Sequence, residues 1–193
     1  MALLILGLVL FFGLHTLPML PSLREPVHAR LGERGYKMAF GILSALGLLL
    51  IIVGFAQLRG SGQDVQLWSP PGWARHVAFA LMLPALILMV AAYAPSRIRE
   101  LAGYHPLLLG IMVWALAHLI TNGDLAGLLL FGGFLVWAIA DRISTGERGD
   151  VGPLGRKPGT LTGDIIAVVI GCALYAIILK WGHQFIAGVP LTG

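Results

Sequence analysis

The chain has 193 residues, of which 58% are hydrophobic and only 11% are charged. Water-soluble domains carry about 25% charged residues, so this composition excludes a water-soluble globular protein. It predicts an all-α fold, a polytopic transmembrane helix bundle that forms one integral-membrane domain over residues 1–193. The formal charge of +4 comes from Lys and Arg in loops, which is typical of membrane proteins and gives no reason to expect a nucleic-acid partner. The single cysteine, Cys172, lies in an apolar run, which excludes a disulfide framework.

Apolar runs predict about six membrane-spanning helices. The first covers about residues 2–19 and ends at Pro18 and Pro21; it lacks the basic start of a secretory signal, so we expect a retained helix. A polar connector over residues 24–37 leads to a second helix over 38–57, and a third covers 73–94, where Pro84 is expected to introduce a kink. The fourth lies in the stretch 104–124. The fifth ends near residue 142 and the sixth covers 164–184.

The tight turn at residues 121–124 predicts that the fourth and fifth helices are antiparallel neighbours. Pairs of small residues predict where helices approach each other closely. They are Gly41 with Ala45, Gly123 with Gly127, and Ala167 with Gly171.

Lys and Arg divide unequally between the two sides of the predicted bundle. With six spans, the loops after the first, third and fifth helices share one side, and both termini lie on the other. Ten of the 13 Lys and Arg residues fall in those three loops, namely Arg24, Arg30, Arg34, Lys37, Arg97, Arg99, Arg142, Arg148, Arg156 and Lys157. The other three are Arg59, Arg75 and Lys180. The positive-inside rule therefore predicts that these three loops face the cytoplasm and that both termini lie on the outer side of the membrane.

Two histidines lie within predicted spans, where an ionisable group usually has a function. His15 is late in the first helix and His118 is late in the fourth. Trp114, His118 and Asn122 are spaced four residues apart, so they share one helix face. Imidazole is a common axial ligand of haem iron, so we identify His15 and His118 as candidate metal ligands.

The remaining histidines have simpler explanations. His28 is in a loop and His183 is near a helix end, so both are expected to be structural or solvated. His76 and His105 start helices, where capping or contact with the membrane surface suffices, and they are kept as backup ligands.

Three polar side chains near these positions have possible supporting roles. Arg75 suits an anionic group such as a haem propionate, although contact with lipid headgroups explains it equally well. Asn122 and Asp124 either orient His118 as hydrogen-bonding neighbours or cap the turn that follows it.

Several motifs occur in an order that resembles the NnrU family. They are Leu-His-Thr at 14–16, Leu-Arg at 23–24, Arg-His at 75–76, Tyr-His-Pro-Leu-Leu-Leu-Gly at 104–110, Trp-Ala-Leu-Ala-His at 114–118 and Asn-Gly-Asp-Leu at 122–125. The resemblance is strongest over residues 3–143, and the last helix adds little to it. It implies a bacterial inner-membrane protein, with both termini on the periplasmic side, that has a role in nitrite and nitric oxide metabolism during denitrification.

NnrU proteins are similar to ζ-carotene isomerases, which hold haem b between a histidine of the first helix and one of the His-Pro helix. The matching positions here are His15 and His118, so the resemblance implies haem b between the first and fourth helices. The isomerases also have a cysteine three residues before the second histidine, where this chain has Ala115. Ligand switching and isomerase activity are therefore not implied.

Depth in the membrane argues against a simple pairing of these histidines. Each lies about two-thirds of the way along its helix from the helix start, and the two helices run in opposite directions. The expected mismatch in depth is about 10 Å. A shared iron then requires one helix to be shifted or tilted, or requires His105 as the ligand.

Three classes of function remain open. The first is a haem b protein that serves a respiratory nitrite or nitric oxide reductase by electron transfer, gas sensing or ligand chemistry. An open axial site, with a small apolar or gaseous ligand, would favour the last two roles. The second is an isomerase or methyltransferase acting on a lipid-soluble isoprenoid or carotenoid; the His-Pro run resembles isoprenylcysteine-type methyltransferases, but their later acidic cofactor motif is not visible. The third is a non-enzymatic assembly or transport factor for a respiratory enzyme.

Overall fold

The computed structural model describes residues 1–191, which contain helices and two isolated β-bridges but no strand. The α-helices are α1 (Ala2–Thr16), α2 (Pro21–Gly60), α3 (Ala74–Ala91), α4 (Arg97–Leu101), α5 (Pro106–Leu119), α6 (Leu125–Gly127), α7 (Gly133–Glu147), α8 (Leu161–Ile177) and α9 (His183–Ala187). Three short segments adjoin them: the 3₁₀-helix η1 (Leu17–Met19) and the π-helices η2 (Leu128–Gly132) and η3 (Ile178–Gly182).

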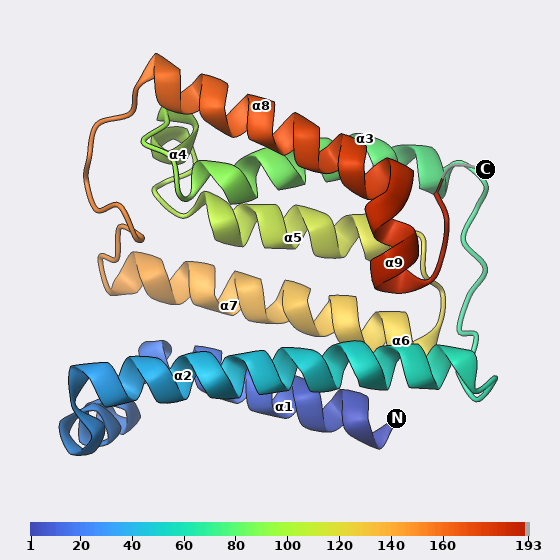
Figure 1. The fold of residues 1–193 in the computed structure, drawn as a ribbon, viewed down its shortest axis with the longest axis horizontal. Helices are drawn as coiled ribbons and strands as arrows, with labels where there is room; N and C mark the ends of the chain where they lie inside the picture. Colours follow the sequence, from blue (N-terminus) through green and yellow to red (C-terminus); the bar gives the residue numbers. More distant parts are fainter. Residues whose placement is uncertain (192–193) are drawn as a thin grey trace.

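The helices form six passes that lie side by side (Figure 1). Five are long and apolar enough to cross a membrane, and the sixth, α5, is apolar but has only 14 residues. The passes are α1, α2, α3, α5, the run from α6 to α7 and the run from α8 to α9. The start of α1 and the end of α9 lie at the same end of the bundle, which we call the terminal end. The opposite end, which carries α4 and the loop between α7 and α8, is called the loop end. The predicted helical membrane bundle is confirmed, whereas the membrane side that each end faces stays a prediction.

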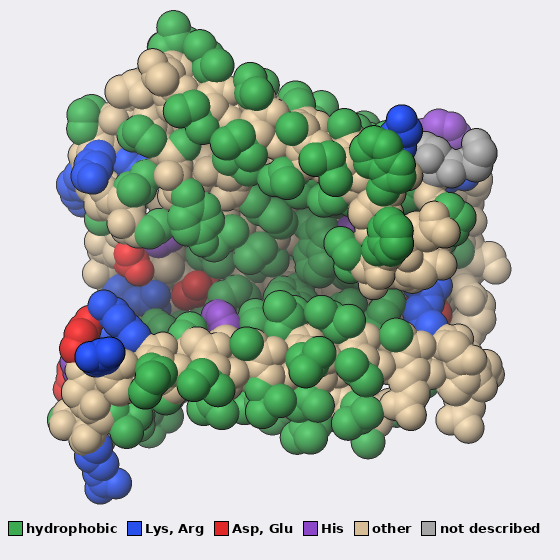
Figure 2. Space-filling model, viewed as in Figure 1, with side chains coloured by type: hydrophobic (Ala, Val, Ile, Leu, Met, Phe, Trp, Pro, Cys, Tyr) green, Lys and Arg blue, Asp and Glu red, His purple; other side chains and the backbone are tan. Residues whose placement is uncertain are grey.

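Two groups of helices are joined by the fifth pass. Helix α1 packs mainly on α2, and α3 packs on both α5 and α8, while α7 contacts α5 and lies between the two groups (Figure 1). The main buried cluster comes from α1, α2, α5, α6 and η2 and comprises Leu4, Leu8, Ile51, Leu58, Ala115, Ala126, Leu130 and Phe131. Viewed with side chains, the surface is hollowed between α2 and the helices around α8 and α9, and the floor of the hollow is largely hydrophobic (Figure 2).

Glycine allows the backbones of α1 and α2 to meet. A Cβ on Gly54 would lie 2.3 Å from the Leu4 nitrogen, and one on Gly7 would lie 2.6 Å from the Ile51 nitrogen. The buried residues of α2 fall at positions 47, 51, 54 and 58, which is one helical face. The predicted close approach at Gly41 is wrong, because a Cβ there meets nothing within 4 Å. Its sequence distance of six residues from Gly47 turns it to another side of the helix.

The predicted contact at Gly171 is confirmed. A Cβ at this position would lie 2.9 Å from the Ile87 Cα of α3, and both Ala167 and Gly171 are buried. The predicted close approach at Gly123 and Gly127 involves loops instead of another helix. Gly123 faces the Trp68 carbonyl, and Gly127 faces the side chains of Asn122 and Asp124.

Several predicted connections are more regular than expected. The polar connector at residues 24–37 is helical and forms the start of α2, with a single break at Gly32, where φ is 67° and ψ is 170°. The basic loop before α5 contains α4, which Ser96 caps by accepting a hydrogen bond from the Arg99 nitrogen. Pro84 lies inside α3, which continues through it as one helix. The expected sixth helix changes to a π-helix at Ile178 before α9 begins.

Candidate functional site

His118 lies near the end of α5 in an aromatic setting. Its Nδ1 donates a hydrogen bond to the Trp114 carbonyl at 2.8 Å; because a carbonyl only accepts, the proton is on Nδ1. The Nε2 lone pair is then available to a metal ion. Phe131 stacks on the imidazole with ring centroids 4.5 Å apart, and the Trp114 ring lies 5.1 Å away. The bond to the Trp114 carbonyl therefore fixes the orientation of the His118 imidazole, the candidate ligand identified from the sequence.

Two π-helices bring side chains to this imidazole. Phe131 belongs to η2, and His183 follows η3 directly. A π-turn inserts one extra residue into a helical turn and so changes the direction of the side chains after it; such turns are frequent at functional sites. The ring centroids of His118 and His183 are 6.4 Å apart, and the ring planes differ by 18°. The expected structural or solvated role of His183 did not take its contact with the His118 imidazole into account.

His183 is held by the turn that ends α9. Gly188 adopts a left-handed conformation with φ 70°, which reverses the chain. The carbonyl of Val189 then returns to accept a 2.8 Å hydrogen bond from the His183 Nδ1. As in His118, this bond leaves Nε2 available.

His15 occupies a similar setting near the other end of the bundle. Its Nδ1 donates to the Phe11 carbonyl at 2.8 Å, and the Phe11 ring stacks on the imidazole with centroids 4.0 Å apart. Phe40 and Trp137 complete the surroundings at 5.0 and 5.8 Å. Nε2 is again available, so His15 stays a candidate ligand.

Helix α7 provides a measure of how far apart His15 and His118 lie. His15 contacts Trp137 of α7, whereas His118 contacts Phe131, six residues earlier. Six residues of helix rise about 9 Å. This offset agrees with the mismatch in depth expected from the sequence. Two axial nitrogens of one iron are only about 4 Å apart, so His15 and His118 do not fit the same iron in this arrangement.

The other predicted site residues at the terminal end have structural partners. Asn122 donates from its side-chain amide to the His118 carbonyl at 2.8 Å, and its side-chain oxygen accepts a 3.3 Å hydrogen bond from Arg59. Asp124 caps α6 by accepting a 2.6 Å hydrogen bond from the Gly127 nitrogen and pairs with Arg59 at 3.2 Å. Arg75 donates to the Leu191 carbonyl. Asn122 thus touches the backbone of His118 and does not reach its imidazole.

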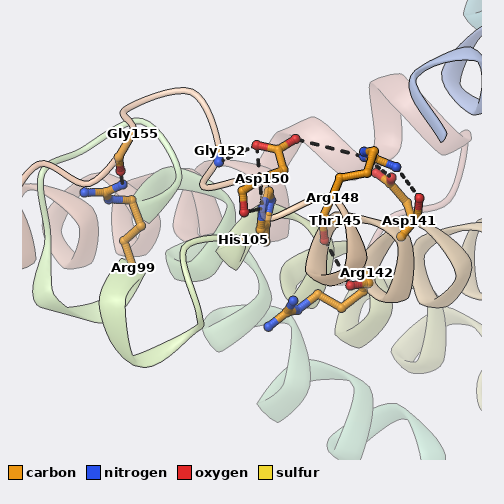
Figure 3. A network of polar contacts seen from close by, with 10 residues as sticks. Arg99, His105, Asp141, Arg142, Thr145, Arg148, Asp150, Gly152 and Gly155 are labelled. Atoms are coloured by element: carbon orange, nitrogen blue, oxygen red, sulfur yellow. Dashed lines mark hydrogen bonds and ion pairs between the residues drawn. The ribbon is translucent and has the colours of Figure 1, made fainter. Parts of the chain in front are cut away.

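The two backup ligands, His105 and His76, and the loop histidine His28 have other surroundings. His105 is at the loop end, where its Nε2 is 2.8 Å from the Asp150 carbonyl (Figure 3). His76 is exposed in the first turn of α3, and His28 contacts Glu33 at 2.8 Å. Within residues 1–191, no group of three or more His, Cys, Asp or Glu side chains is arranged to hold a metal ion.

The sequence was compared with models of protein families. The model described as NnrU protein matches residues 3–191. The chain belongs to the NnrU family. The match extends the expected resemblance of residues 3–143 through α8 and α9, so the helices that carry His183 are part of the NnrU region. Neither the search of curated proteins nor the search of solved structures gives a match.

Proposed function

We propose that this NnrU-family protein binds a b-type haem at the terminal end of its helix bundle, with His118 as an axial ligand, and that it serves nitrite and nitric oxide respiration. The observation that carries the proposal is the orientation of His118, whose Nδ1 is bound to the Trp114 carbonyl and whose Nε2 is available. A hydrogen bond from the other ring nitrogen to a carbonyl fixes the tautomer and increases the basicity of the nitrogen that binds the metal.

The surroundings of His118 suit a flat, apolar group. Trp114 and Phe131 flank the imidazole, with ring centroids 5.1 and 4.5 Å from its own. Haem supplies the redox and ligand-binding chemistry of such a site, while the protein provides the axial nitrogen and excludes water. His15 is the second ligand that the family resemblance implies. It could join His118 only if α1 and α5 shift by about 9 Å relative to each other.

The test is the absorption spectrum of the full-length protein, purified in detergent after expression with an adequate supply of haem. We expect a Soret band and a b-type pyridine haemochrome. His118→Ala should abolish or strongly reduce both, because it removes the axial nitrogen. The matched control is His28→Ala, which replaces a histidine that contacts Glu33 at the loop end and should retain the wild-type spectrum. A wild-type protein without a Soret band would contradict the proposal.

A second candidate function is supported by a row of aromatic rings. Neighbouring ring centroids are 4.0–6.4 Å apart along Tyr36, Phe40, His15, Phe11, Phe134, Trp114, His118 and His183. Such a row also suits an extended isoprenoid or carotenoid, as expected for an enzyme with a lipid-soluble substrate. Incubation with polyenes followed by product analysis distinguishes this function, since haem binding alone leaves the polyene unchanged.

A further inference from the structure

The contact between His118 and His183 joins two passes of the bundle that are distant in sequence. His118 ends α5, whereas His183 starts α9, 65 residues later. Both passes run from the loop end to the terminal end, so their last turns lie at the same depth (Figure 1). Each imidazole donates its Nδ1 proton to a backbone carbonyl, Trp114 for one and Val189 for the other. Each therefore retains an Nε2 lone pair that can bind a metal.

The distance between the His118 and His183 rings can be compared with the distances expected for two imidazoles bound to one metal. A metal ion bound about 2 Å from Nε2 lies about 3.2 Å from the centroid of the imidazole ring. Two imidazoles on opposite sides of one metal then have centroids about 6.4 Å apart, whereas two ligands at a tetrahedral angle have centroids about 5.2 Å apart. The observed separation is 6.4 Å. This separation equals the largest distance at which two imidazoles can share one metal, and the two ring planes differ by 18°.

We infer that His118 and His183 are paired ligands of one transition-metal centre, with His183 delivered by η3 and the turn at Gly188. The inference rests on the proposed function where the metal is haem iron. The metal has two possible sources, haem iron and a bare divalent ion, because each accepts two imidazole nitrogens. If haem iron were held by both histidines, the site would suit electron transfer, because a gaseous ligand would first have to displace an imidazole.

The experiment compares the spectra of full-length His183→Ala and His15→Ala proteins with that of the wild type. His76→Ala is the matched control, since it removes an exposed histidine at the same end of the bundle. We expect ferric low-spin haem in the wild type and in the His15 and His76 variants. His183→Ala should retain haem but become high-spin. His183→Gln, which keeps a donor for the Val189 carbonyl, should give the same spectrum as His183→Ala and separates loss of the ligand from loss of the turn.

Two results would overturn the inference. If His183→Ala and His183→Gln remain low-spin while His15→Ala becomes high-spin, His15 is the partner of His118; the proposed function then stands and the inference fails. If the wild type contains no haem, the proposed function fails, and Co²⁺ titration of the same protein decides the inference. Visible absorption bands of bound Co²⁺ that disappear in both His118→Ala and His183→Ala support the pair, and their absence from the wild type overturns it.

Discussion

Gly54→Ala should destabilise the protein by about 1–3 kcal/mol, the usual cost of overpacking a close contact. The new Cβ would lie 2.3 Å from the Leu4 nitrogen and 2.7 Å from the Leu4 Cα. Both are backbone atoms, so no change of side-chain rotamer relieves the clash. Helices α1 and α2 must separate, which weakens the buried cluster around Leu4 and Ile51. Thermal unfolding of the purified protein in detergent, followed by circular dichroism, measures the effect.

Gly41→Ala is the matched control for this prediction. It lies in the same helix, and its Cβ would meet nothing within 4 Å. Alanine lowers the conformational entropy of the unfolded chain, so this variant should be unchanged or stabilised by about 0.5–1 kcal/mol. Equal unfolding temperatures for the two variants would show that the contact between α1 and α2 does not limit stability.

The glycines also show what the sequence could and could not predict. Six apolar runs predicted six passes, because burying backbone in a membrane requires helices of that length. Composition alone does not give the rotation of a helix about its axis. Gly41, Gly47 and Gly54 are chemically identical in the sequence. Only the packing of α1 decides that positions 47 and 54 face a neighbour and that position 41 does not.

The candidate site was predictable in part. Helix periodicity correctly placed Trp114 beside His118, and the direction of the helices correctly predicted the offset between His15 and His118. The same topology places the ends of the fourth and sixth passes at one depth, which was a usable signal for His183. The π-turns of η2 and η3 were not predictable, because one extra residue in a helical turn is stabilised by tertiary contacts and leaves no periodic pattern.

The second large effect is expected at the loop end, where Arg99 is fully buried with 0% of its surface exposed. Its guanidinium donates to the Gly155 carbonyl at 2.5 Å and to the Lys157 carbonyl, and it lies 5.1 Å from the centre of the Tyr104 ring. Figure 3 shows how this side chain joins α4 to the loop between α7 and α8. A hydrogen bond from a charged donor contributes about 1.5–3 kcal/mol. Arg99→Leu removes these bonds and leaves the carbonyls without their donor.

We therefore expect Arg99→Leu to open this loop locally and to accelerate tryptic cleavage after Arg156 by at least about tenfold, since 1.4 kcal/mol changes an opening equilibrium tenfold. The bond after Lys157 is not a tryptic site, because Pro158 follows it. Mass spectrometry of the fragments identifies the cleavage site.

Arg97→Leu is the matched control from the same short helix. Arg97 is 55% exposed and pairs with Asp164, and exposed ion pairs contribute only about 0–1 kcal/mol. Cleavage that rises equally in both variants would mean that general weakening of α4, and not the buried guanidinium, holds the loop. His105 contacts the Asp150 carbonyl of the same loop. Opening of this loop in Arg99→Leu should leave the absorption spectrum of the His118 site unchanged. That result would show that the contacts at the loop end do not determine the structure around His118.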